Sequence, residues 1–82
     1  FMIEYKFEPE NYRSAAYEQG KMIGACEYTI QEGKWYIMHT VVDPVYQGKG
    51  IARQLVMDVV EHAEKKGIDV VPICSYAVKI LK

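Results

Sequence analysis

The sequence predicts an α+β fold in which an antiparallel sheet comes first and a long helix and a final parallel strand follow. Two apolar patterns indicate this. Up to residue 42, apolar and polar residues alternate in segments separated by turn residues, which is typical of half-buried strands. From residue 51 the apolar residues recur at steps of three and one, as on a helix with one buried face.

The alternating segments predict four antiparallel strands, over residues 2–7, 13–18, 22–31 and 34–42. Gln19-Gly20-Lys21 and Glu32-Gly33 separate the last three segments and are typical of hairpin turns. The first half of the chain is therefore expected to be a meander.

The second half predicts a helix over residues 50–66, a parallel strand over 69–73 and a short helix over 75–82. Gly67 is a natural helix stop, and Ser75 is a suitable cap for the last helix. A continuous apolar run between them suits a strand buried on both faces. Strand, helix and strand form a βαβ unit, so the strands at 34–42 and 69–73 are expected to run parallel.

Length and charge limit the classes of function. The 82 residues are expected to form one domain, residues 1–82, and its 10 basic and 11 acidic residues nearly balance. This gives no support for nucleic-acid or membrane-surface binding. No secretory leader is recognised, and the two cysteines lack metal-ligand spacing, so we expect a cytoplasmic monomer with free thiols and no metal.

Glycines lie where the fourth strand gives way to the long helix. Gly48 and Gly50 permit left-handed backbone and close approach of a ligand, while the first helical amides and Lys49 favour an anion. The Walker and dinucleotide loops both fail on spacing. A plain glycine-rich connection with an exposed lysine is the alternative interpretation.

A longer string favours the anion site. Gln47-Gly48-Lys49-Gly50-Ile51-Ala52 fits the pattern Q/R-x-x-G-x-G/A and resembles the pyrophosphate loop of the GNAT superfamily of N-acetyltransferases. "MHTVVDPVYQGKGIARQLV" (residues 38–56) and "GIDVVPICSYAV" (residues 67–78) resemble the minimal single-domain GNAT-like family, which ends in a P-x-C-[SP]-[FY] motif. The resemblance runs from about Arg13 to the C-terminus, and its second half is the specific part.

The resemblance implies a truncated GNAT-like fold that binds acetyl-coenzyme A or coenzyme A. Backbone amides of the loop would hold the pyrophosphate, and the end of the fourth strand would pair with the pantetheine arm like an added strand. The strands ending at Val42 and Ile73 would splay apart to admit the arm. The expected cofactor-binding residues are Thr40, Val41, Val42, Gln47, Gly48, Lys49, Gly50, Ile51, Ala52 and Cys74.

Cys74 is the first candidate for catalysis. It precedes a helix cap, and a thiol at a helix N-terminus is a better nucleophile because the helix dipole stabilises the thiolate. The resemblance implies that it accepts the acyl group. The alternative is a buried small apolar residue, which is also our interpretation of Cys26.

His39 is the second candidate. It lies near the end of the strand that meets the cofactor, where a neutral imidazole could serve as general base to an amine or to Cys74. A half-buried histidine bonded to a neighbour is the alternative. Val41 stands where related sequences often carry an acidic residue, and this removes one candidate base. His62, on the polar side of the long helix, is expected at the surface.

Three functions remain open. The leading hypothesis is an acetyl-coenzyme A-dependent acyltransferase that acts on an unknown amine of a protein or small molecule. The second is a non-catalytic module that binds coenzyme A or acetyl-coenzyme A. The third is a protein-interaction domain that uses an exposed edge strand rich in tyrosine.

Overall fold

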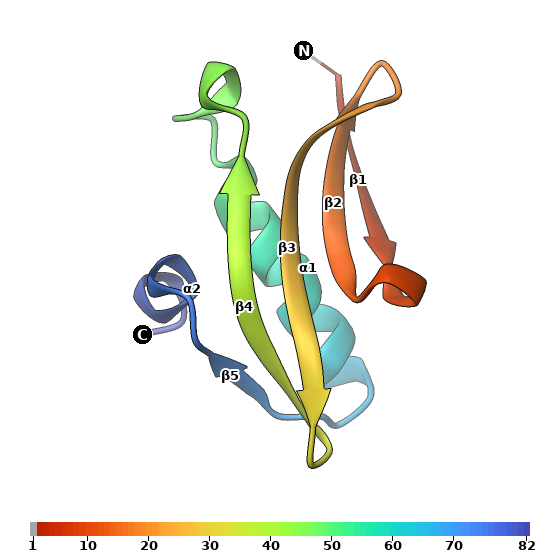
Figure 1. Cartoon of the computed structure of the whole chain (residues 1–82), viewed down its shortest axis with the longest axis vertical. Helices are drawn as coiled ribbons and strands as arrows, with labels where there is room; N and C mark the ends of the chain where they lie inside the picture. Colours follow the sequence, from red (N-terminus) through yellow and green to blue (C-terminus); the bar gives the residue numbers. More distant parts are fainter. Residues whose placement is uncertain (1) are drawn as a thin grey trace.

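The computed structural model describes residues 2–82, which form one twisted sheet with helices packed on it (Figure 1). The strand order is β1-β2-β3-β4-β5; the first three pairs are antiparallel and β4 pairs with β5 in parallel. The α+β prediction is therefore confirmed. The strands are β1 (Ile3–Glu8), β2 (Arg13–Glu18), β3 (Lys21–Gln31), β4 (Lys34–Val42) and β5 (Val70–Pro72). The helices are η1 (Pro9–Asn11), η2 (Pro44–Tyr46), α1 (Ile51–Lys65) and α2 (Ser75–Ile80).

Helix α1 covers one face of the sheet and supplies much of the core. Its buried stripe consists of Ile51, Leu55, Val56, Val59 and Ala63, at the spacing read from the sequence. Each large aliphatic side chain buried there contributes about 1.5–3 kcal/mol relative to exposure. The Ser14 hydroxyl donates to the backbone carbonyl of Leu55 at 2.7 Å, so a buried polar group of β2 also ties the sheet to α1.

An aromatic cluster closes the core near the end of α1. The rings of Tyr28 and Trp35 stack with centroids 4.3 Å apart, and Phe7 stacks on His62 at 3.8 Å. His62 is therefore half-buried against an aromatic ring, and the expectation of a simple surface residue was wrong. The face of α1 that carries His62 looks polar in the sequence, but it is partly covered because Phe7 of β1 packs on it.

Two β-bulges interrupt the sheet, and neither has a clear signal in the sequence. The second lies between Glu27 and Tyr28, where Met38 is the extra residue of β4. An extra residue changes which side chains face the core. Beyond this bulge Cys26 pairs with Thr40, and Glu27 pairs with His39. The first pair lies on the α1 side, because Cys26 is fully buried in the core.

Strands β2 and β4 have the predicted bounds, and the other elements differ by one or two residues. β1 begins and ends one residue later than predicted, and β3 begins one residue earlier. α1 begins at Ile51 because Gly50 is left-handed, and α2 ends at Ile80. β5 is only Val70–Pro72, because the N–H groups of Ile73 and Cys74 both donate to the carbonyl of Ile37 and end the ladder.

Two further features concern the range 2–82 only. No helix among these residues is long and apolar enough to cross a membrane. No group of three or more histidine, cysteine, aspartate or glutamate side chains is arranged there to hold a metal ion.

Candidate active site

The loop between β4 and α1 lies at the end of the sheet where the β2–β3 turn also lies (Figure 1). Asp43 caps the short helix η2, and its carboxylate accepts the backbone N–H of Val45 at 3.0 Å. The carbonyls of Asp43 and Pro44 then accept the N–H groups of Tyr46 at 2.8 Å and Gln47 at 3.2 Å. These bonds fix the point at which the glycine loop starts.

Gly48 and Gly50 both have left-handed backbone, with φ of 81° and 78°. Side chains are rarely tolerated in this region, so the loop conformation explains why glycine stands at both positions. A Cβ added at either residue would meet no atom of residues 2–82 within 4 Å. The loop surface is therefore open at these two points, and space remains for a ligand close to the backbone.

The first turn of α1 leaves donors available next to this loop. Gly50 is the N-cap, and no side chain of the described residues caps the helix there. The first N–H groups of a helix have no partner within the helix, and the helix dipole adds partial positive charge. The open glycine backbone and these amides together provide the hydrogen-bond donors that bind a phosphate at a helix N-terminus.

Tyr46 anchors the start of the loop to the sheet. Its hydroxyl donates a hydrogen bond to the carboxylate of Glu18, at the end of β2. This bond, more than desolvation, raises the pKa of Tyr46. Local sequence carries no signal for this contact, because it depends on the β2–β3 turn lying beside the loop.

A pocket of about 360 Å³ runs from the glycine loop to the end of β4. It brings together residues of β4, the loop, the first turn of α1 and α2. It is lined by Thr40, Val42, Tyr46, Gln47, Gly48, Gly50, Ile51, Ala52 and Tyr76. Most of the expected cofactor residues therefore share one pocket. Val41, Lys49 and Cys74 are outside this lining; Val41 and Lys49 are exposed, and Cys74 is half-buried.

Strands β4 and β5 are paired only over three residues. Trp35, Tyr36 and Ile37 pair with Val70, Val71 and Pro72. Beyond Ile37 the chain after β5 leaves the sheet, so that, among residues 2–82, β4 from Met38 onward has no β5 partner. An unpaired strand edge offers backbone donors and acceptors to an extended ligand.

Cys74 lies beside this edge and caps α2. Its sulfur accepts the backbone N–H of Ala77 at 3.3 Å, and it lies 3.5 Å from the Thr40 hydroxyl. Thr40 therefore joins the thiol to the pocket that contains the loop. The cysteine is half-buried, which leaves part of it accessible.

Cys26 contacts the same hydroxyl. Thr40 Oγ1 lies 3.5 Å from the Cys26 sulfur, so one hydroxyl touches both thiols. Burial raises the pKa of Cys26 to about 11, which keeps it a neutral thiol near physiological pH. It is fully buried, as expected of a packing residue, but it also borders Thr40. That contact follows from the register of β3 and β4 and could not be read from local sequence.

His39 lies away from the thiols. Successive residues of a strand point to opposite faces, so His39 and Thr40 are on opposite sides of β4. His39 is exposed and lines a separate pocket with Glu27 and Met38. The structure therefore brings Thr40 and Cys74 together but does not bring His39 to either thiol.

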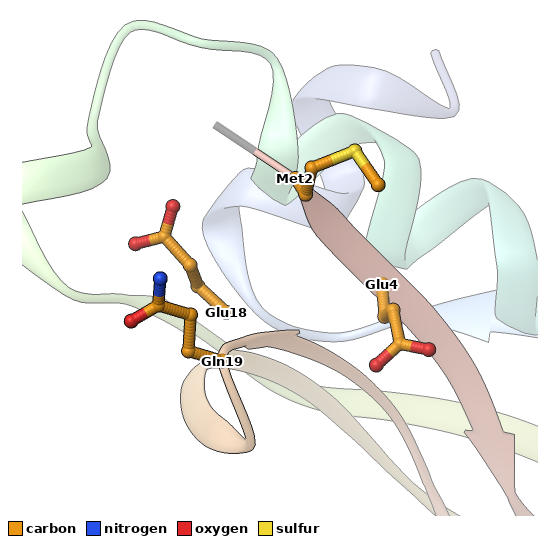
Figure 2. A pocket seen from close by; sticks show the side chains of 4 residues that line it. All are labelled: Met2, Glu4, Glu18 and Gln19. Carbon is orange, nitrogen blue, oxygen red and sulfur yellow. The ribbon is translucent and has the colours of Figure 1, made fainter.

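Another pocket, near the start of β1, is lined by Met2, Glu4, Glu18 and Gln19 (Figure 2). Figure 2 shows Glu4 on β1, with Glu18 and Gln19 coming from the end of β2 and the turn after it. Its two charged lining residues are carboxylates, which repel phosphate. This pocket is therefore unsuited to a pyrophosphate, although Glu18 also bonds to Tyr46.

Comparisons with known proteins point to one family. The family model of the GCN5-related N-acetyltransferases matches residues 11–82. No curated protein matches the sequence. A GCN5-related N-acetyltransferase from Sphaerobacter thermophilus is 27% identical with a TM-score of 0.68, over 73% of this chain and 20% of that one. PaiA N-acetyltransferase from Thermoplasma acidophilum, solved with coenzyme A, is 27% identical with a TM-score of 0.63, over 68% and 35%.

A third structure shows the fold alone. The Escherichia coli ribosomal-protein-S18-alanine N-acetyltransferase has a TM-score of 0.71 at 21% identity, over 90% of this chain and 52% of that one. The chain thus spans between a fifth and about half of these three proteins. Since the family model covers most of the chain and includes the glycine loop and Cys74, the chain belongs to the GCN5-related N-acetyltransferase family.

Proposed function

We propose that this domain is an acetyl-coenzyme A-dependent acyltransferase that transfers acetyl to an amine. The observation that carries the proposal is the pocket that starts at the glycine loop and ends at Thr40, whose hydroxyl contacts Cys74. A phosphate site and a partly accessible thiol are thus joined by one pocket. Acetyl-coenzyme A carries pyrophosphate and thioester at the two ends of one arm, so one molecule suits both.

The pyrophosphate is held by backbone amides of residues 47–52. The support is the open left-handed backbone at Gly48 and Gly50, together with the uncapped first turn of α1. Lys49, exposed at the tip of the loop, adds a positive charge close by. The Thermoplasma protein was solved in complex with coenzyme A, which supports coenzyme A as the ligand here.

The pantetheine arm follows the unpaired end of β4 toward Cys74. Thr40 and Val42 line the pocket, and the backbone of Val41 between them contributes its peptide groups to the strand edge. An extended amide-bearing arm satisfies such an edge as an added strand does. Tyr76 closes the pocket from α2.

Cys74 is the acyl acceptor in this proposal. Its thiolate attacks the thioester carbonyl, its sulfur–carbon bond forms as the coenzyme A carbon–sulfur bond breaks, and the amine then displaces it. The Thr40 hydroxyl lies 3.5 Å from the sulfur and orients it. Direct attack of the amine on the thioester is the other route to the same product.

Mass spectrometry after incubation with acetyl-coenzyme A tests the proposal. We expect one added acetyl group on Cys74, absent in Cys74→Ser and retained in Cys26→Ser, with subsequent transfer to an added amine. Transfer by Cys74→Ser at the full rate would show that the amine attacks directly. Failure of coenzyme A to bind would refute the proposed function.

A non-catalytic coenzyme A-binding module is the second candidate. The observation that favours it is Val41, a 67% exposed aliphatic residue near the end of β4 that supplies no base to deprotonate an amine. Stable acetyl-Cys74 with no transfer to any amine would support this module. In both cases a single copy of the chain supplies the loop and Cys74.

A further inference from the structure

We propose that β1 pairs antiparallel with β1 of a second copy of this chain, about a two-fold axis at Tyr5, so that the two sheets become one. The interaction surface is the outer edge of β1, and the partner is the same edge of the second copy. The inference is independent of the proposed acetyl transfer, and it departs from the monomer expected from the sequence.

Strand β1 is an edge strand within residues 2–82. It comes first in the order β1-β2-β3-β4-β5, and Figure 1 shows it at the side of the sheet away from β5 and α2. All six of its residues pair with β2, from Ile3 with Glu18 to Glu8 with Arg13. Alternate residues of an antiparallel strand direct their N–H and C=O groups away from that partner. The outer edge of β1 therefore offers donors and acceptors to another strand.

The side chains of β1 divide into an apolar face and a charged face. Ile3 and Phe7 pack against the core on the α1 side. Tyr5, halfway between them, lies on the same face because side chains alternate along a strand. Glu4 and Lys6 therefore point to the opposite face, and both are exposed.

The charges favour one register for two copies of this strand. A two-fold axis perpendicular to the sheet keeps both α1 helices on one side and pairs residues that share a face. With the axis at Tyr5, Glu4 of each copy lies opposite Lys6 of the other, and Ile3 lies opposite Phe7. An axis at Glu4 or at Lys6 would place that charge opposite itself, which is destabilising. The register at Tyr5 thus makes two opposite-charge pairs on one face and an apolar row on the other.

An axis at Phe7 is disfavoured because Glu8 is already engaged. That axis would place Lys6 opposite Glu8. The Glu8 carboxylate accepts hydrogen bonds from Arg13 at 2.7 Å and from the Tyr17 hydroxyl at 2.6 Å. Axes closer to either end of β1 also pair fewer of its residues.

Glu4 and Lys6 are accessible for the proposed contacts. Neither forms a salt bridge within residues 2–82. The Lys6 ammonium lies 5.3 Å from the centre of the Tyr17 ring, and the side chain is exposed. Glu4 lines the acidic pocket of Figure 2 together with Glu18, and no lysine or arginine lines that pocket. Lys6 of the second copy is the electrostatic complement of these carboxylates.

The spacing of the two charges makes the edge selective. A lysine on a strand edge often prevents pairing with another chain. Lys6 alone would do so here, because two copies would bring two ammonium groups together. Glu4, two residues earlier on the same face, replaces that repulsion with two attractions. The edge therefore suits a strand of its own sequence.

Two variants of opposite charge test the register in the intact chain. Sedimentation equilibrium from about 10 μM to about 1 mM, a range suited to a weak interface, should show that the wild type dimerises. Glu4→Lys alone and Lys6→Glu alone should each weaken the dimer roughly 10- to 100-fold, since both charge pairs become like-charge pairs. An equimolar mixture of the two variants should form a heterodimer about as tight as the wild-type dimer, because opposite charges face each other again.

Glu32→Lys and Lys34→Glu are the matched controls. Both residues are exposed in the β3–β4 hairpin, and the substitutions change the net charge by the same amounts. Each control should dimerise as the wild type does, and mixing the two should change nothing. A thermal melt of every variant shows that it is folded before its association is compared.

NMR on a mixture of isotope-labelled and unlabelled chains detects the contact itself. Ile3 and Phe7 are four residues apart in an extended strand, or about 13 Å, so a nuclear Overhauser effect between them arises only between two copies. We expect this effect between the Ile3 methyl groups and the Phe7 ring. Its absence in a dimer would overturn the inference.

Three other results would also overturn the inference and leave the proposed function intact. The first is a wild type that stays monomeric at the highest concentration, which would leave the edge to another partner. The second is a dimer that Glu4→Lys and Lys6→Glu do not weaken. The third is a mixture of these two variants that does not associate.

Discussion

Replacement of Gly50 by alanine separates the ligand role of the glycine loop from its structural role. Gly50 has φ +78° and open space around the position of a Cβ. The folded domain therefore suffers backbone strain and no clash. An L-residue in the left-handed region costs about 1–2 kcal/mol. For a domain of this size each kcal/mol lowers Tm by about 4–8 °C.

Gly33→Ala is the matched control. Gly33, in the β3–β4 turn, has φ +75° and the same open space, but it lies at the opposite end of the sheet from the loop (Figure 1). The two variants should therefore lose similar amounts of stability. Only Gly50→Ala places a methyl group where the pyrophosphate should approach the backbone.

The expected difference is in affinity for coenzyme A, measured by isothermal titration calorimetry. A hydrogen bond from an amide to a charged acceptor contributes about 1.5–3 kcal/mol, so displacement of the phosphate from one amide weakens binding roughly 10- to 100-fold. Gly33→Ala should bind as tightly as the wild type. Equal affinities for the two variants would refute the role of the loop.

Three other predictions concern Cys26, Ser14 and Glu8. Iodoacetamide near pH 8 should alkylate Cys74 and leave Cys26 unmodified. Cys26 is buried, and its pKa of about 11 leaves about a thousandth of it as thiolate. Equal labelling of the two cysteines in a peptide map would contradict this packing. Ser14→Ala should lower the free energy of unfolding by about 1 kcal/mol in urea, because the Leu55 carbonyl loses its hydroxyl donor, and an unchanged urea midpoint would argue against that bond. Hydrogen bonds from the Tyr17 hydroxyl and then from Arg13 lower the pKa of Glu8 below its ordinary value of 4.5. The ionised carboxylate therefore stabilises the fold fully above pH 4.5, and this stabilisation is lost as the pH falls through the lowered pKa of the folded state. Glu8→Gln should accordingly cost about 0.5–1 kcal/mol near neutral pH and nothing in strong acid, and a cost that persists in acid would show that packing is responsible.

The order and type of the main elements could be predicted because their apolar patterns are local. The stripe on α1 and the alternation in β3 and β4 each lie within one segment, and the observed elements agree with them. The bulge at Met38 could not be predicted. It depends on how two strands twist against each other, and one extra residue leaves the apolar pattern nearly unchanged.

The glycine loop and Cys74 were identified by a family motif, but their surroundings were not. The contacts of Thr40 with Cys26 and Cys74 join residues 14 and 34 positions apart in the chain. The sequence around Cys26 therefore does not show that it lies beside Thr40. The position of His39 on the opposite face likewise depends on the register beyond the bulge, which only the folded sheet defines.

A titration with coenzyme A followed by backbone NMR tests whether the glycine loop and the end of β4 bind this cofactor. We expect chemical-shift changes confined to residues 41–54 and 73–79, which include the glycine loop, the end of β4 and the start of α2. Changes centred instead on Met2, Glu4 and Glu18, the acidic pocket of Figure 2, would contradict it. So would the absence of any change at saturating coenzyme A.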